Sequence, residues 1–259
     1  MRTLESLLGG EWTRTGEWID VRDPAGVRTP LDRVPLLSAK DVIRACDHAE
    51  RGFAARKRTS PFERARILTE ATGETLKAVE SLEHCAGVAR QGYGVLLHDV
   101  RPNHRTHTQR KPIGVILVIS PWNDPLITPA RKLAPLLAAG NAAVFRPATE
   151  TPLSGLHFAR ALHDAGLPAG VLNVVTGRTA EIEEALPDDP RIAGVTFTGS
   201  DAVGNRIRRR LADRSVRFQG ELGGENASVV LRDAARPPPR WSAPLPSARP
   251  ASAAPPSAG

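Results

Sequence analysis

Short apolar runs separated by helix-like stretches fill the second half of the chain, and this alternation restricts the fold more than any other feature. The first run, residues 113–119 (IGVILVI), holds no polar side chain. Strands that are apolar on both faces are required where helices cover both sides of a parallel sheet. We therefore predict an α/β fold with a doubly wound parallel sheet over residues 111–235. The further runs lie at 142–145, 171–175, 195–197, 216–218 and 227–231, with helical stretches at 125–139, 153–165 and 201–211.

Residues 1–110 are predicted to form a helical N-terminal lead-in after a short irregular or strand-like start. Two segments have the features of helix starts, residues 38–41 (SAKD) and 60–63 (SPFE). Each pairs a serine side chain with an acidic residue three positions later, the arrangement that satisfies free N–H groups in the first helical turn. We expect the first helix to end near residue 57 and the second near residue 85.

The last 24 residues differ in composition from the rest of the chain. Residues 236–259 hold eight of the 23 prolines, and their only large apolar side chains are Trp241 and Leu245. Proline at this density removes backbone donors, and so little apolar surface cannot support a core. We predict a disordered or polyproline II tail. Two explanations stay open for its abrupt start, a flexible terminal segment and translation in the wrong reading frame.

Charge and cysteine content argue against several classes of protein. The net charge of the 259 residues is +7, and the three arginines of the tail leave +4 for the remainder. The arginines within residues 206–217 favour a solvated helix face over a nucleic-acid surface. Two cysteines are too few for a disulfide scaffold, and no apolar run approaches the roughly 20 residues of a membrane span. We expect a cytoplasmic protein that binds neither nucleic acid nor membrane.

Polar residues follow the first predicted strand, at the sheet edge where ligands bind in folds of this kind. The segment reads Ser120, Pro121, Trp122, Asn123. Asn123 either offers its side-chain amide to a ligand as a neutral donor or caps the following helix.

Three later strand ends carry further candidates. Arg146 and Thr149 follow the second strand and suit a ribose or phosphate oxygen, unless the arginine is only a solvated charge at the rim. Gly199 and Ser200 precede a helix whose N-terminus favours an anion such as a pyrophosphate, although the chain has no G-x-G-x-x-G sequence. Glu221 lies between glycines, as a general base or as part of a surface turn.

Taken in order, four segments resemble the aldehyde dehydrogenase superfamily. They are residues 111–154 (KPIGVILVISPWNDPLITPARKLAPLLAAGNAAVFRPATETPLS), 166–177 (GLPAGVLNVVTG), 195–204 (VTFTGSDAVG) and 220–234 (GELGGENASVVLRDA). The resemblance implies a Rossmann-like cofactor domain, a separate catalytic domain and an oligomerisation arm. It also implies an enzyme that oxidises a small-molecule aldehyde to a carboxylic acid with NAD or NADP, assembled in the family as a homo-oligomer.

The same resemblance implies roles for individual residues. Asn123 would donate to the oxyanion formed from the aldehyde, and Glu221 would activate the water that releases the acid. Gly199 and Ser200 would hold the pyrophosphate of the cofactor, and Val203 would lie against adenine. It adds a set of further cofactor-binding positions and implies no metal. These positions are Ser120, Pro121, Trp122, Arg146, Thr149, Gly177 and Leu222.

Two departures from the family concern the cofactor. The family usually has lysine where Arg146 stands, and many NAD-specific members have glutamate where Thr149 stands. Without that carboxylate nothing repels a 2′-phosphate, and Arg146 can pair with one. We therefore expect NADP to be tolerated beside NAD.

The family's nucleophilic cysteine, which follows the glutamate by a few tens of residues in the catalytic domain, has no counterpart. Cys46 and Cys85 both precede the predicted sheet, within predicted helices of the lead-in, and are expected to be buried structural residues. We expect a truncated or frameshifted member that lacks the catalytic domain and is inactive, with the change near residue 235. The alternative is a cofactor-binding fragment without catalysis or a product prone to misfolding.

Overall fold

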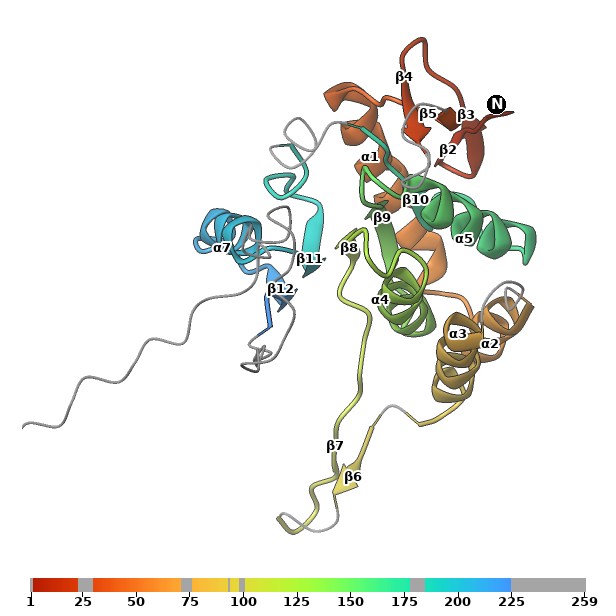
Figure 1. The fold of residues 1–259 in the computed structure, drawn as a ribbon. Helices are drawn as coiled ribbons and strands as arrows, with labels where there is room; N and C mark the ends of the chain where they lie inside the picture. The colour runs from red at the N-terminus through yellow and green to blue at the C-terminus, as the bar shows by residue number, and fades with distance from the viewer. Residues whose placement is uncertain are drawn as a thin grey trace, which may run out of the picture.

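The central element is a five-stranded parallel sheet (Figure 1). The computed structural model describes residues 2–22, 30–70, 76–92, 94–97, 101–177 and 185–224. The strand order is β10-β9-β8-β11-β12, so the chain reverses its direction of winding between β8 and β11. This order confirms the predicted doubly wound α/β class. The strands are β8 (Val115–Ile119), β9 (Ala142–Arg146), β10 (Leu172–Val174), β11 (Ile192–Thr198) and β12 (Arg217–Glu221).

Helices pack on both faces of this sheet, which explains why β8 and β9 lack polar alternation. Every residue of these two strands is buried. The helices α4 (Ile127–Ala138) and α5 (Pro152–Asp164) share one hydrophobic cluster with Val118 and Phe145. On the opposite face, α7 (Asp201–Arg210) and α1 (Ala39–Arg56) pack against Leu117 and Val144. The predicted strands and helices between residues 113 and 218 are thus confirmed, with shifts of a few residues at their ends.

The start of the chain holds more strand than predicted. A three-stranded sheet has the order β1-β5-β4, and β2 and β3 form a separate antiparallel pair. These strands are at most six residues long and several are half exposed, so they leave no strong apolar pattern in the sequence. Their bounds are β1 (Arg2–Thr3), β2 (Ser6–Leu8), β3 (Glu11–Thr13), β4 (Trp18–Arg22) and β5 (Pro30–Pro35).

The helices of the lead-in follow their predicted starts but not all their predicted ends. At the start of α1, the Ser38 N–H donates to Asp41 Oδ2 at 3.0 Å and the Asp41 N–H donates to Ser38 Oγ at 3.4 Å. The single helix predicted over residues 60–85 is wrong, because the structure has α2 (Pro61–Glu70) and α3 (Leu76–Ala89) in its place.

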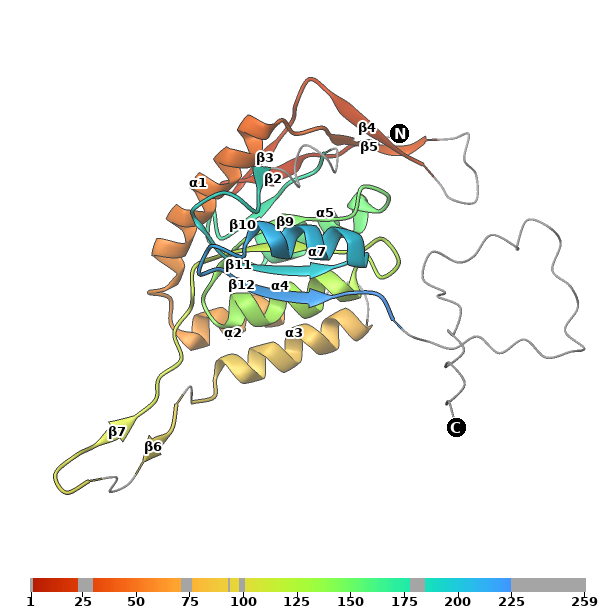
Figure 2. The same cartoon turned by 90° about the vertical axis from the view of Figure 1, so that its left-hand side faces the viewer.

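The lead-in and the sheet share one hydrophobic core. Ile67 of α2 and Leu82 of α3 belong to the same buried cluster as Leu133 of α4 and Phe145 of β9. One part of the lead-in extends away from this core, the pair β6 (Leu96–Leu97) and β7 (Thr106–His107), as Figure 2 shows. The predicted strand at 227–231 and the predicted tail lie outside the described residues.

Candidate cofactor and catalytic site

The strand register brings the predicted site segments to one edge of the sheet. Ile119 of β8 pairs with Arg146 of β9 on one side and with Phe197 of β11 on the other. One step further along β11, Thr198 pairs with Glu221 of β12. The loops that follow these strands therefore begin at the same level, around the point where the winding of the sheet reverses. Ligands bind at such switch points in α/β sheets.

The loop after β8 leaves the Asn123 side chain free. The N-cap residue of α4 is Leu126, and no side chain caps this helix, so the alternative that Asn123 caps it is wrong. Asn123 is exposed, and its amide makes no hydrogen bond with another described residue. The loop is fixed at its base, where the buried Ser120 donates its N–H to the Arg146 carbonyl at 3.3 Å. Pro121 follows Ser120 and is half-buried.

Trp122 is the most exposed ring of this loop, with 63% of its surface accessible. Its carbonyl accepts a hydrogen bond from the Thr151 hydroxyl at 3.4 Å. This bond ties the loop after β8 to the start of α5. The indole ring therefore lies at the outer rim of the site.

Arg146 is a buried cation and not a solvated rim charge. Only 6% of its surface is exposed, and its Nη2 donates to Thr149 Oγ1 at 2.9 Å. Thr149 thereby orients the guanidinium at the end of β9. Gly177, which follows the end of β10 by three residues, is also buried.

The loop after β11 leads into α7 without a side-chain cap. Ser200 is the N-cap residue of α7, and its exposed hydroxyl accepts no capping hydrogen bond. The Gly199 N–H donates to the Glu221 carbonyl at 3.2 Å, which joins this loop to the end of β12. Asp201 accepts a hydrogen bond from the Gly223 N–H at 2.8 Å. The first N–H groups of α7 are thus free of any Ser200 cap, an arrangement that suits a phosphate oxygen.

The segment after β12 makes a close contact with α7. A Cβ atom added to Gly204 would lie 2.3 Å from Leu222 Cδ2, so only glycine lets this leucine approach the helix. Leu222 itself is 37% exposed. Val203, the neighbouring residue of α7, is half-buried.

A polar cluster beneath Glu221 contains a functional candidate that the sequence did not reveal. Lys132 of α4 is 8% exposed, and its Nζ donates to Thr196 Oγ1 at 2.8 Å and to Gln219 Oε1 at 3.3 Å. Gln219 in turn donates from Nε2 to Glu221 Oε1 at 2.7 Å. Burial lowers the pKa of Lys132 to about 8, and the nearby Glu221 carboxylate limits the fall. The only signal in the sequence was a lysine between buried positions of α4.

Neither cysteine has the properties of a reactive thiolate. Cys46 of α1 is fully buried, and burial together with the Asp189 carboxylate raises its pKa to about 12. Burial also raises the pKa of the Cys85 thiol in α3. The thiolate is the nucleophilic form, so neither residue is prepared for attack at neutral pH.

Two of the six arginines within residues 206–217 serve local structure. Arg210 forms an ion pair with Asp188. Arg214 donates to the carbonyls of Pro187, Asp189 and Ile192. Arg210 and Arg214 therefore fix the segment before β11.

Within the described ranges, no group of three or more histidine, cysteine or acidic side chains is placed to hold a metal ion. A search of the same ranges finds no helix with the length and apolar character needed to cross a membrane.

The sheet order and the loops at its switch point place the chain among the doubly wound α/β proteins. The chain belongs to the aldehyde dehydrogenase family, whose family model matches residues 67–236. The sequence segments that resembled this family are thus confirmed as marks of membership.

Several known proteins are similar over most of this chain. The 2,5-dioxopentanoate dehydrogenase of Saccharolobus solfataricus is 36% identical over 88% of the chain and 54% of that protein. The alpha-ketoglutaric semialdehyde dehydrogenase of Bacillus subtilis is 32% identical over 90% of the chain and 53% of that protein. A solved structure, the NADP-dependent glyceraldehyde-3-phosphate dehydrogenase of Bacillus halodurans complexed with NADP, has a TM-score of 0.80 and 31% identity, covering 86% and 53% of the two chains. The chain therefore spans about half the length of these relatives.

Proposed function

We propose that this chain is the cofactor-binding half of an NAD(P)-dependent enzyme that oxidises an aldehyde to a carboxylic acid. The observation that carries the proposal is the strand register, which starts the loops of Asn123 and Gly199 at the level of Glu221. Family membership and relatives that are dehydrogenases of aldehydes support it. The bound nicotinamide would accept a hydride from the substrate.

Two side chains of this chain have chemical roles in the proposal. The free amide of Asn123 donates to the oxygen of the aldehyde as negative charge develops on it. Glu221 takes a proton from the water that releases the acid. Gln219 donates to one oxygen of the Glu221 carboxylate at 2.7 Å and orients this carboxylate.

Cofactor binding is assigned to the loops after β9 and β11. The N–H groups at the start of α7, uncapped by Ser200, suit the pyrophosphate. Leu222 and Val203 supply apolar surface beside them.

The nucleophile is not supplied by this chain. Aldehyde oxidation of this type needs a thiolate, and the raised pKa values of Cys46 and Cys85 oppose that form. We therefore expect the chain to bind the cofactor without turnover. Calorimetric titration of the purified chain with NADP should give saturable one-site heat, while no NAD(P)H should form from propanal. Formation of NAD(P)H would contradict the assignment of the nucleophile, and the absence of cofactor binding would overturn the proposed function.

We propose that Arg146 and Thr149 let the site accept NADP beside NAD. The guanidinium is held by the threonine hydroxyl, and Thr149 brings no carboxylate to repel a 2′-phosphate. The variant Thr149→Glu should weaken NADP binding at least tenfold and leave NAD binding within about threefold. Thr149→Ser keeps the hydroxyl that accepts from Arg146 and adds no charge, so this matched control should lose little NADP affinity. Equal effects of the glutamate and serine variants on NADP would contradict this role.

We also propose that the β6–β7 pair joins two copies of this chain. Val95 precedes β6, and Leu96 and Leu97 form it; they are 58%, 61% and 44% exposed, although all three are large and apolar. Exposed apolar surface of this kind favours association. The variant Leu96→Glu should shift sedimentation of the chain toward the monomer, and unchanged sedimentation would contradict the assignment.

A further inference from the structure

The buried amine of Lys132 has the geometry of a nucleophile. Its Nζ donates to Thr196 Oγ1 at 2.8 Å and to Gln219 Oε1 at 3.3 Å. The Thr196 hydroxyl donates its own proton to Gln219, which turns its oxygen toward the lysine as an acceptor. A neutral amine has two N–H groups and one lone pair, and these two bonds use both N–H groups. The lone pair then has no donor among the described residues.

Burial acts on this amine and on the cysteine thiols with opposite consequences. It lowers the pKa of Lys132 to about 8 and raises the pKa of Cys46 to about 12. In both cases burial disfavours the charged form, which is the nucleophile for a thiol but the unreactive form for an amine. Lys132 is therefore about half neutral near pH 8, where a lysine with the ordinary pKa of about 10.4 is neutral to less than about 1%.

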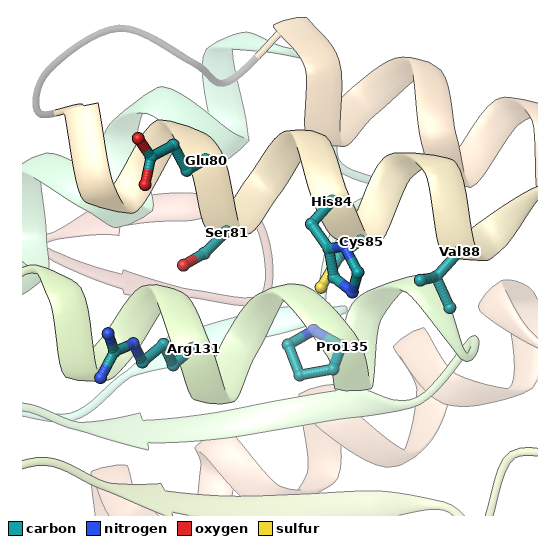
Figure 3. Close-up of a pocket in the computed structure, with 7 residues that line it drawn as sticks. All are labelled: Glu80, Ser81, His84, Cys85, Val88, Arg131 and Pro135. Carbon is teal, nitrogen blue, oxygen red and sulfur yellow. The ribbon is translucent and has the colours of Figure 1, made fainter.

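The cluster around Lys132 is open to solvent at β12, the edge strand of the described sheet. Gln219 and Glu221 of this strand are exposed, whereas Lys132 is only 8% exposed, which restricts approach to small molecules. Arg131, the preceding residue of α4, lines a groove between α3 and α4 that encloses about 440 Å³ (Figure 3). Consecutive residues of an α-helix point about 100° apart. The groove and the amine therefore lie on different sides of α4.

We propose that Lys132 captures a small, unbranched aldehyde as an imine, in a reversible reaction that needs no cofactor. The Nζ lone pair forms a bond to the carbonyl carbon, and the carbonyl π electrons move to the oxygen. Both N–H protons end on this oxygen, which leaves as water while the second carbon–nitrogen bond forms. Glu221, whose carboxylate acts on Lys132, carries these protons. The inference rests on the proposed function in one respect, that an aldehyde reaches the cluster at Glu221.

The experiment traps the imine on the full chain. Propanal and sodium cyanoborohydride are added at pH 8 together with Nα-acetyllysine as an internal reference, and propylated lysines are located by peptide mass spectrometry. The borohydride gives a hydride to the imine carbon and fixes the adduct as a secondary amine. Lys132 should be propylated at least fivefold faster than the reference. This ratio should fall about fivefold between pH 8 and pH 9, because the reference gains neutral amine nearly tenfold while Lys132 gains less than twofold.

Matched comparisons separate a built site from chance modification. Pivaldehyde carries its aldehyde on a fully branched carbon and should lower the ratio at least fivefold, because Lys132 is nearly covered. Gln219→Glu replaces an amide that accepts from Lys132 by a carboxylate of the same size. This charge keeps the amine protonated, so propylation at pH 8 should fall at least fivefold. Arg131→Met changes the neighbouring charge on the groove side of α4 and should keep the preference for Lys132.

Three results would overturn the inference. They are propylation of Lys132 no faster than that of the reference, a ratio that stays constant with pH, and equal ratios for propanal and pivaldehyde. Calorimetric titration of the untreated chain with NADP tests the proposed function separately, because the trapping reaction uses no cofactor. Saturable NADP heat without selective propylation would leave the proposed function standing and remove the imine. Selective propylation without NADP heat would do the reverse.

Discussion

Lys132 brings a positive charge into the interior, and its titration gives a direct test of the cluster below Glu221. Its pKa falls from 10.5 to about 8, because burial outweighs the attraction of the Glu221 carboxylate. Between these two pH values the unfolded chain binds more protons than the native chain, so stability must rise with pH. The charged lysine therefore lowers stability below pH 8, and this loss disappears as pH approaches 10.5.

The pKa difference sets the size of the effect. A shift from 10.5 to about 8 corresponds to about 3 kcal/mol of unfolding free energy gained across this pH range. Lys132→Met removes the titration, but it also removes the hydrogen bonds to Thr196 and Gln219. Each bond to a charged group contributes about 1.5–3 kcal/mol. The unfolding free energy at pH 7 is therefore a poor test of whether the charge of Lys132 is buried, whereas the change of this free energy with pH is a sharp test.

The assay is urea unfolding followed by circular dichroism at pH 7.5 and pH 10. Between these two pH values the unfolding free energy of the wild-type chain should rise by about 2 kcal/mol relative to that of Lys132→Met. This is slightly less than the gain over the whole range between the two pKa values of Lys132. The raised pKa values of Cys46 and Cys85 lower stability at high pH, but they act equally in both proteins and cancel in the difference. Lys40→Met, at an exposed position of α1, is the control and should follow the wild type. Parallel curves for wild type and Lys132→Met would refute the burial of this charge.

Three other substitutions test the packing of the lead-in. Gly52→Ala should lower stability by about 1–3 kcal/mol, because the added carbon would lie 2.3 Å from the backbone of Gly170, which cannot move aside. Gly87→Ala on α3 should raise stability by about 0.5–1 kcal/mol, since no atom lies within 4 Å of the added carbon. Equal thermal midpoints for the Gly52→Ala and Gly87→Ala variants would contradict the close approach of α1 to Gly170. Arg56→Met should raise the thermal midpoint, because it removes a fully buried charge that is poorly compensated. The Nε and Nη1 atoms of Arg56 have no hydrogen-bond partner among the described residues, and its Nη2 donates to the Leu137 carbonyl at 3.4 Å. A lower midpoint for Arg56→Met would show that this bond outweighs the burial of the charge.

The accuracy of the sequence-based fold depended on how completely each element is buried. β8 and β9 were predicted within two residues of their ends, because both faces of each strand are covered and no polar residue interrupts the pattern. The strands before residue 36 were predicted only as a short irregular or strand-like start, because their pairs are short and partly exposed. The break between α2 and α3 was missed because apolar spacing continues on both sides of it.

The residues of the candidate site were predicted from the sequence, but some of their properties were not. Its residues after β8, β9, β11 and β12 were named from motifs, since each motif lies within a few consecutive residues. The freedom of the Asn123 amide was not decided by the motif, because the alternative capping role depends on where α4 begins. The state of Arg146 also stayed open, because its burial depends on the packing around β9 and on the Thr149 hydroxyl.

The sequence by itself determined the alternation of strand and helix, the family and the residues at the strand ends, because these depend on local composition and short motifs. Only the tertiary structure decided which charges are buried and which polar groups remain free. Lys132 meets Gln219 across 87 positions of sequence, and Arg131 faces α3 across a groove that no motif encodes. Such contacts arise from the packing of whole elements, and burial then sets the pKa and the availability of each side chain.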